Sequence, residues 1–244
     1  SKKIRLNIET EIKQSERDIN GLFDIELLNK KNSFEYIFNN ETLNFLSKNK
    51  NFSGELKFKP FYLSSDLKFN YVSRKKILKN DALIIDLLDS ELLNNSNINA
   101  IFNIQIDKID KFEFLTDFIL ELQLVDGRII MSNFNADWNE SLSIKSTDIE
   151  FINDKNGKKL VGEIKFEFND VEKFFRYFQI KRNYRNVFKD IKADFVYDLT
   201  EDKISLNNVK IDNVSNQMLE DLLDKYNNGN KNLLNKVIFR NFVK

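Results

Sequence analysis

The chain has 244 residues, of which 41% are hydrophobic and 31% are charged. This balance is typical of a folded chain with a packed core and excludes an intrinsically disordered protein. Lys and Arg together number 38, as do Asp and Glu, so the formal net charge is zero. The sequence therefore lacks the basic excess that proteins use to contact phosphates, and we expect no nucleic-acid partner.

Two residue types that carry much of protein chemistry are missing. The chain has no Cys, which excludes disulfides, zinc-thiolate sites and cysteine nucleophiles, and no His, the commonest general base. Its six glycines are isolated, so they form no phosphate-binding loop, and no Ser lies in a nucleophile elbow. Asp126 and Asp154 could be imagined as Ca²⁺ ligands, but Asp is common in turns. We therefore expect a non-enzymatic protein without metal or cofactor.

Apolar and polar residues alternate in the first part of the chain, which predicts half-buried β-strands. The predicted strands cover residues 3–9, 21–28, 51–63 and 66–72, and two short alternating runs within 33–47 are interpreted as strands as well. The single proline, Pro60, lacks a backbone N–H and is expected at a strand end or edge. Residues 77–93 have helical spacing and predict one or two short amphipathic helices. Such a helix either lies on a membrane surface or plugs a groove, or it closes one end of the sheet.

The clearest strand pattern lies between residues 97 and 138. Apolar residues occupy alternate positions from Ile98 to Ile106 and again from Phe118 to Leu124. The dipeptide Asp126-Gly127 follows, which is the strongest short-range signal for a β-hairpin. The return strand of this hairpin runs from Ile129 to Trp138. Because successive strand side chains point to opposite faces, this sheet has one apolar face and one polar face.

The C-terminal part alternates strands with short helical patterns. Strands are predicted at 142–151, 159–168, 193–199 and 203–211, the last two as a hairpin turning at 200–202. Asn169-Asp170 predicts the start of a helix over 171–178, with Glu172 in its first turn. The basic stretch 181–185 would suit nucleic acid or lipid head groups, or a solvated turn. Helical spacing recurs at 214–226 and 230–244.

These elements predict a mainly β fold with inserted short helices (α+β), arranged as an antiparallel meander. A closed sandwich or barrel is one solution of such a pattern, and an elongated, curved, groove-like sheet is the other. Residues 1–244 are interpreted as a single β-rich segment with a possible soft boundary near 48–52. A strand pattern that begins at once at the N-terminus predicts a fragment of a longer protein.

The order of these features resembles the C-terminal region of the AsmA-like family of Gram-negative envelope proteins. The matching residues are Phe52-Ser53-Gly54-Glu55-Leu56, Pro60-Phe61, Asp66-Leu67, the helical Leu83–Leu93, Asn97-Ile98-Asn99-Ala100, Leu122–Gly127, Ile129–Phe134, Trp138, Gly162-Glu163-Ile164, Val171–Phe178, Arg182, Ile191 and Asp194–Leu199. The resemblance covers residues 51–226 and is one of order and pattern, with no catalytic signature.

The resemblance implies a long β-sheet groove lined with apolar residues. It also implies a role in outer-membrane biogenesis and in bridge-like transport of phospholipid between the inner and outer membranes. The expected location is the periplasm, with attachment to the inner membrane through a helix that is not in this chain. The expected partners are phospholipid and other envelope proteins.

An acyl chain needs an apolar trough and no catalytic group. The residues expected to line such a trough are Phe102, Ile104, Ile106, Leu120, Leu122, Leu124, Phe134, Ile164 and Phe166. The same residues would be ordinary core if the sheet closes on itself or on the helices. A structural or protein-interaction β domain without a lipid groove, binding a partner through a sheet edge, is therefore the alternative. An uncovered apolar trough favours the first function, and a closed core favours the second.

Overall fold

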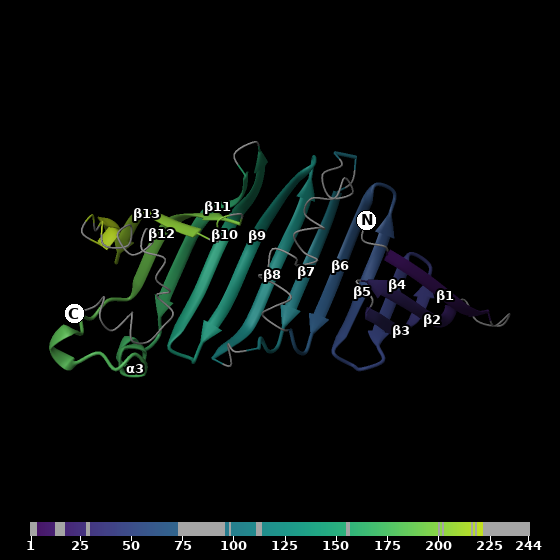
Figure 1. Ribbon diagram of the computed structural model, residues 1–244, viewed down its shortest axis with the longest axis horizontal. Coiled ribbons are helices and arrows are strands. Elements are labelled where there is room, and N and C mark those ends of the chain that lie inside the picture. Colours follow the sequence, from purple (N-terminus) through teal and green to yellow (C-terminus); the bar gives the residue numbers. More distant parts are fainter. Residues whose placement is uncertain are drawn as a thin grey trace. The chain divides into compact units, whose positions relative to one another are not determined.

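A computed structural model describes residues 4–12, 18–27, 30–72, 96–97, 99–110, 114–154, 157–199, 201, 203–215, 217 and 219–221. The fold is mainly β, an open sheet whose strands follow chain order from β1 to β14 (Figure 1). The predicted fold class, a mostly antiparallel meander with few short helices, is confirmed. The chain divides into two compact units, a first unit of residues 1–113 and 119–129 and a second unit of residues 114–118 and 130–244.

The first unit consists of consecutive strands joined by short turns. Its strands are β1 (Ile4–Ile12), β2 (Asp18–Leu27), β3 (Lys30–Asn39), β4 (Thr42–Ser47), β5 (Phe52–Lys59), β6 (Tyr62–Phe69) and β7 (Asn99–Ile106), with most of β8 (Leu115–Val125). The two strand runs predicted within 33–47 are β3 and β4. Neighbouring strands from β1 to β6 pair in antiparallel fashion.

One pair in the first unit departs from the predicted antiparallel meander. Strands β6 and β7 are parallel, with Tyr62 opposite Asn99 and Phe69 opposite Ile106. Parallel neighbours need a crossover connection of a dozen residues or more, and residues 70–98 provide that length. Pattern alone does not fix strand direction, so this pairing was not predicted. The helices expected at 77–93 lie outside the described residues.

A tight turn divides the predicted strand 51–63 in two. Strand β5 ends at Lys59 and β6 begins at Tyr62, so the prediction of one continuous strand was wrong. Pro60 lies just beyond the end of β5, as expected from its missing N–H. Phe61 has a φ of 60°, the conformation that the second central residue of a type II turn requires after proline. Two turn residues interrupt the apolar alternation too briefly for the pattern to reveal them.

The hairpin predicted at Asp126-Gly127 is confirmed. The φ angles of Asp126 and Gly127 are 52° and 74°, and both are positive, as a type I′ turn demands. This turn joins β8 to β9 (Arg128–Trp138).

The second unit continues with antiparallel strands and one short helix. Its elements after β9 are β10 (Leu142–Asp154), β11 (Gly157–Phe168), α3 (Val171–Tyr177), a 3₁₀ helix (Arg182–Tyr184), β12 (Asp190–Asp198), β13 (Lys203–Ile211) and β14 (Val214–Ser215). The four strands predicted here are confirmed. Val214 and Ser215 form β14 and not the start of the helix predicted over 214–226, but residues 217 and 219–221 are helical as predicted. The pattern at 230–244 lies outside the described residues.

A β-bulge in β10 explains why its apolar residues change parity. Even-numbered Ile144 is followed by odd-numbered Ile149 and Phe151, and the register against β11 shifts between Thr147 and Glu150. The extra residue of the bulge reverses the alternation, so Phe151 points to the same face of the sheet as Ile144. Ile149 is only 6% exposed, and a Cβ on Gly162 would lie 2.9 Å from it.

Helix α3 closes one part of the apolar face of the second unit. The Asp170 side chain accepts a hydrogen bond from the Lys173 backbone N–H at 2.7 Å, which confirms the predicted helix start. Phe174, Phe175 and Phe178 pack with Leu142 into a buried cluster. The cluster also contacts partly buried neighbours, namely Trp138, Ile144, Phe166, Phe168, Val171, Tyr177 and Phe188. The second unit therefore has a closed hydrophobic core at this end.

The basic stretch 181–185 is held in part by its own neighbours. The Arg185 guanidinium donates to the Ile180 carbonyl at 2.8 and 2.6 Å, and it pairs with Glu172 at 2.6 Å. Because the Arg185 side chain is 15% exposed and occupied by these contacts, it stabilises the turn after α3. These contacts favour the structural interpretation of the stretch over a head-group site.

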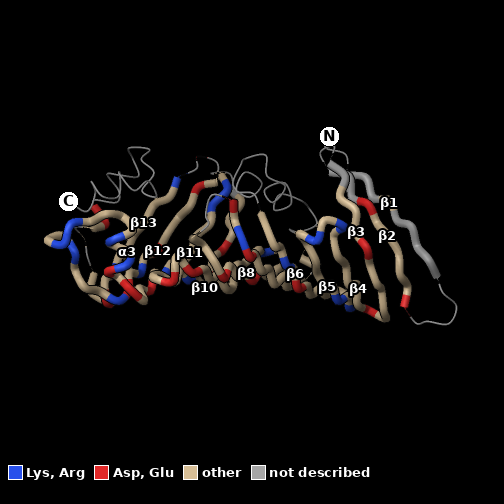
Figure 2. Tube along the Cα trace, turned by 90° about the horizontal axis from the view of Figure 1, so that it is seen from below, with Lys and Arg blue, Asp and Glu red and all other residues tan. Residues whose placement is uncertain are grey.

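Ion pairs stabilise the polar face of the second unit. Charges of both signs are interspersed along the strands (Figure 2). The Glu167 carboxylate lies 2.5 Å from the ammonium groups of Lys145 and Lys165. Hydrogen bonds from Lys145 and then Lys165 lower the pKa of Glu167 from 4.5 to about 2.

Glu167→Gln tests this cluster through the pH dependence of stability. Because the folded-state pKa is lowered, the pairing stabilises the fold above pH 4.5 and is lost as the pH falls towards 2. We expect the variant to lose about 1 kcal/mol of unfolding free energy at pH 7, a value reduced by solvent screening. The difference from wild type should vanish as the pH falls from about 5 to about 2, as measured by urea unfolding.

Glu163→Gln, on the same face of β11, is the matched control. No comparable loss is expected, because no ammonium pairs closely with Glu163 among the described residues. Equal losses in the two variants would contradict the assignment.

Candidate functional site

Strand register gathers the apolar side chains of the first unit on one face. Residues that pair across the ladder share a face, so the pairing of β2 to β7 defines three rows. The rows are Phe23, Phe34, Ser47, Phe52, Phe69 and Ile106; then Gly21, Tyr36, Phe45, Gly54, Leu67 and Ile104; then Ile19, Phe38, Leu43, Leu56, Ser65 and Phe102. None of these residues is charged. We call this surface the apolar face.

Aromatic rings form a continuous array within the apolar face. Phe23 stacks on Phe34 with centroids 4.7 Å apart, and Phe52 stacks on Phe69 at 4.2 Å. Phe45 joins the two pairs edge-on, 5.9 Å from Phe34 and 5.2 Å from Phe52. Aromatic pairs of this kind each contribute about 0.5–1.5 kcal/mol beyond the area that they bury. The array therefore ties β2 to β6 through side chains as well as backbone hydrogen bonds.

Gly54 makes room for the centre of this array. It pairs with Phe45 across the ladder, and a Cβ there would lie 2.7 Å from the tip of the Phe45 ring. The same Cβ would lie 2.8 Å from Leu67 and 3.0 Å from the Asp66 carbonyl. The ring thus covers the glycine, an arrangement known to protect glycine in strands.

The structure places three of the predicted lining residues in the apolar face of the first unit. Phe102, Ile104 and Ile106 alternate along β7 with the exposed Asn103 and Gln105. Their register with β6 sets them beside Ser65, Leu67 and Phe69 in the three rows. The predicted parity of this strand is therefore confirmed.

The other predicted lining residues lie on β8 and in the second unit. Leu120 and Leu122 are half-buried, and Leu124 is 2% exposed. In the second unit, the Phe134 ring meets Phe118 edge-on at 5.2 Å. Ile164 packs with Ala193 and Val209, and Phe166 packs against the α3 cluster. These contacts are those of ordinary core residues.

Sequence reasoning missed the aromatic array. All five phenylalanines lie in predicted strands, but none of them was placed among the expected lining residues. Phenylalanine at alternate positions of strands joined by short turns was the available signal. The register that brings the rings together follows from the turns, and the turn at 60–61 was not recognised.

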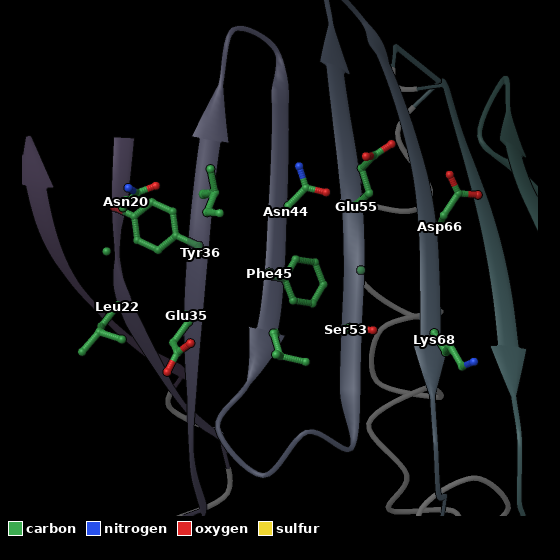
Figure 3. Close-up of a pocket in the computed structure, with 14 residues that line it drawn as sticks. Asn20, Leu22, Glu35, Tyr36, Asn44, Phe45, Ser53, Glu55, Asp66 and Lys68 are labelled. Atoms are coloured by element: carbon green, nitrogen blue, oxygen red, sulfur yellow. The ribbon is translucent and has the colours of Figure 1, made fainter. Parts of the chain in front are cut away.

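The opposite face of the same strands contains a shallow hollow of about 850 Å³ (Figure 3). Figure 3 shows Asn20, Asn44, Glu55 and Asp66 along one side, and Leu22, Glu35, Ser53 and Lys68 along the other. The strand backbone between these two lines of side chains forms the floor of the hollow. The residues at that level belong to the second row, and their side chains point to the apolar face. Leu22, Ile37 and Leu46 are between 36% and 48% exposed here. The hollow is therefore chemically mixed, with carboxylates, amides, one lysine and three apolar side chains.

The described residues contain no group of three or more acidic side chains that could hold a metal ion. No described helix is long and apolar enough to cross a membrane. A comparison of the chain with protein-family models, curated proteins and solved structures finds no match.

Gly54→Ala tests the packing of the aromatic array. We expect a net loss of about 1 kcal/mol of unfolding free energy, because the Phe45 ring must shift by several tenths of an ångström. Near-ultraviolet circular dichroism should change as well, since the ring contacts change. Ser53→Ala, the neighbouring residue on the other face, should leave the near-ultraviolet spectrum unchanged. A Gly54→Ala variant as stable as wild type would show that the array tolerates a methyl group.

Proposed function

We propose that this chain is a non-enzymatic segment of a cell-envelope protein that binds phospholipid acyl chains along its apolar face. The observation that carries the proposal is the set of three uncharged rows that cross β2 to β7 in register. An apolar face of this extent suits a long hydrocarbon chain better than a compact polar substrate.

The dimensions of the rows agree with an acyl chain as ligand. Neighbouring strands lie about 4.8 Å apart, so a row across six strands spans about 24 Å. One leaflet of a bilayer contributes roughly 15 Å of hydrocarbon thickness. A row is therefore longer than the hydrocarbon thickness that one acyl chain fills in a bilayer.

The energetics require no catalytic group. Each buried methylene contributes about 0.8 kcal/mol, and this attraction has no directional requirement. A ligand held in this way can move along the surface without breaking strong individual bonds. Such behaviour fits a conduit that carries lipid without changing it.

The biological setting of the proposal comes from the resemblance to the AsmA-like family. On that basis the segment works in the periplasm, attached to the inner membrane through a part of the protein outside this chain. Its role is phospholipid transport between inner and outer membrane in outer-membrane biogenesis. Other envelope proteins are its proposed partners.

A structural or protein-interaction domain without a lipid groove is the second candidate. The second unit favours it, because α3 covers part of the apolar side and Leu142 and Phe178 are each 3% exposed. Two of the predicted lining residues in this unit, Ile164 and Phe166, pack against its buried clusters. A closed core of this kind would leave no room for an acyl chain.

Native mass spectrometry of the whole chain after incubation with detergent-solubilised dioleoylphosphatidylethanolamine distinguishes the two candidates. We expect a lipid-bound species that Phe102→Asp reduces at least tenfold, because a carboxylate in the third row must be desolvated by the acyl chain. Asn103→Asp places the same charge on the opposite face of β7 and should leave lipid binding unchanged.

Circular dichroism of both variants establishes that each is folded. If Phe102→Asp does not fold, Phe102→Gln is used in its place, with the same expected direction. Absence of any lipid-bound wild-type species would contradict the proposal and support the structural domain. Equal loss in the two Asp variants would show that added charge, and not the apolar face, governs binding.

A further inference from the structure

Four polar side chains are buried among the described residues, and all are serines: Ser47, Ser65, Ser141 and Ser146. Three of them have hydrogen-bond partners. Ser47 Oγ donates to Asn49 Oδ1 at 2.8 Å and accepts from the Phe52 N–H at 2.9 Å. Ser141 Oγ donates to the Trp138 carbonyl at 3.1 Å, and Ser146 Oγ donates to the Glu163 carbonyl.

Ser65 differs from the other three. It is 2% exposed, and its Oγ has no hydrogen-bond partner. Burying a hydroxyl without a partner is costly, and such groups are rare in folded proteins. Among the described residues, Asn20 Oδ1, Asn39 Oδ1 and Asp190 Oδ1 are also buried without a partner, and Ser65 Oγ is the only hydroxyl in this group. A bound ligand that carries an acceptor atom would satisfy this hydroxyl.

The surroundings of Ser65 show what kind of acceptor could reach it. Ser65 is opposite Leu56 on β5 and Phe102 on β7, in the third row of the apolar face. The other members of that row are Ile, Phe, Leu, Leu and Phe. The hydroxyl thus interrupts an otherwise apolar row, at the point where the antiparallel strands meet the parallel strand β7. An apolar ligand that carries an acceptor atom fits these surroundings.

We propose that the Ser65 hydroxyl donates a hydrogen bond to an ester carbonyl of a diacyl phospholipid bound on the apolar face. This inference rests on the proposed function and adds the class of lipid to it. The ester carbonyl lies where the acyl chain begins, so it is the one strong acceptor that an acyl chain carries with it. Because Ser65 is 2% exposed, the ester carbonyl can reach the hydroxyl only when neighbouring side chains move aside.

Other lipid classes fit this position less well. A free fatty acid brings a carboxylate, and the three rows contain no Lys or Arg to pair with it, so its desolvation would be uncompensated. An ether-linked lipid has the same hydrocarbon chains but lacks the carbonyl. The comparison of ester with ether therefore isolates the hydrogen bond from the apolar contact.

The experiment incubates the whole chain with equal amounts of dioleoylphosphatidylethanolamine and its dioleyl diether analogue. Native mass spectrometry then measures the ratio of the two bound species in one spectrum. We expect wild type to favour the diester about threefold to tenfold. This ratio of affinities corresponds to the free energy of one neutral hydrogen bond. Ser65→Ala should bring the ratio to one without weakening diether binding. Ser64→Ala, on the opposite face of β6, should keep the wild-type ratio.

Thermal unfolding of the same variants provides an independent readout. Ser65→Ala should unfold at the wild-type temperature or above it, because it removes an unpartnered buried hydroxyl. Ser146→Ala should unfold at a lower temperature, because the Glu163 carbonyl loses its donor.

The outcomes separate this inference from the proposed function. If wild type binds both lipids equally, or if Ser65→Ala keeps the preference for the diester, the role of Ser65 is refuted and lipid binding stands. If wild type binds neither lipid, the proposed function fails and the role of Ser65 fails with it.

Discussion

The register of strand pairing from β2 to β7 is the constraint on which the apolar face depends. Side chains alternate between the two faces of a strand, so a shift of one residue would move a whole row to the opposite face. The observed register aligns Phe34 with Phe23 and Phe52 with Phe69. Gly54 then allows the Phe45 ring to join both pairs. Backbone hydrogen bonds fix the register, and aromatic contacts reinforce it.

The apolar side of the sheet is packed differently in the two units. In the second unit, a capped helix and its phenylalanines cover the ends of β10 and β11 and form a closed core. In the first unit, the described residues show three uncharged rows interrupted by one buried hydroxyl without a partner. In the proposed lipid complex, the apolar rows would supply affinity for hydrocarbon without directional preference, and the Ser65 hydroxyl would supply selectivity. The first unit is consequently the better candidate for binding lipid.

Much of the local structure could be predicted from the sequence. The positive φ angles at Asp126 and Gly127 follow from their residue types, and Asp170 begins α3 as its side chain predicts. The alternation of Phe102, Ile104 and Ile106 also predicted their common face. Most strands were found because alternation is a local property of each segment. The turn at Pro60 and Phe61 was missed because it interrupts that alternation for only two residues.

By itself, the sequence determined the fold class, most strand positions, the hairpin turn and the absence of Cys and His chemistry, because these depend on residue types and on spacing along the chain. Only the tertiary structure decided the parallel pairing of β6 with β7 and the alignment of five phenylalanines from separate strands. It also revealed that Ser65 is buried without a partner while Ser47 is satisfied by Asn49. These features depend on which strands are neighbours and in which register, and neither is encoded in the alternation of a single strand.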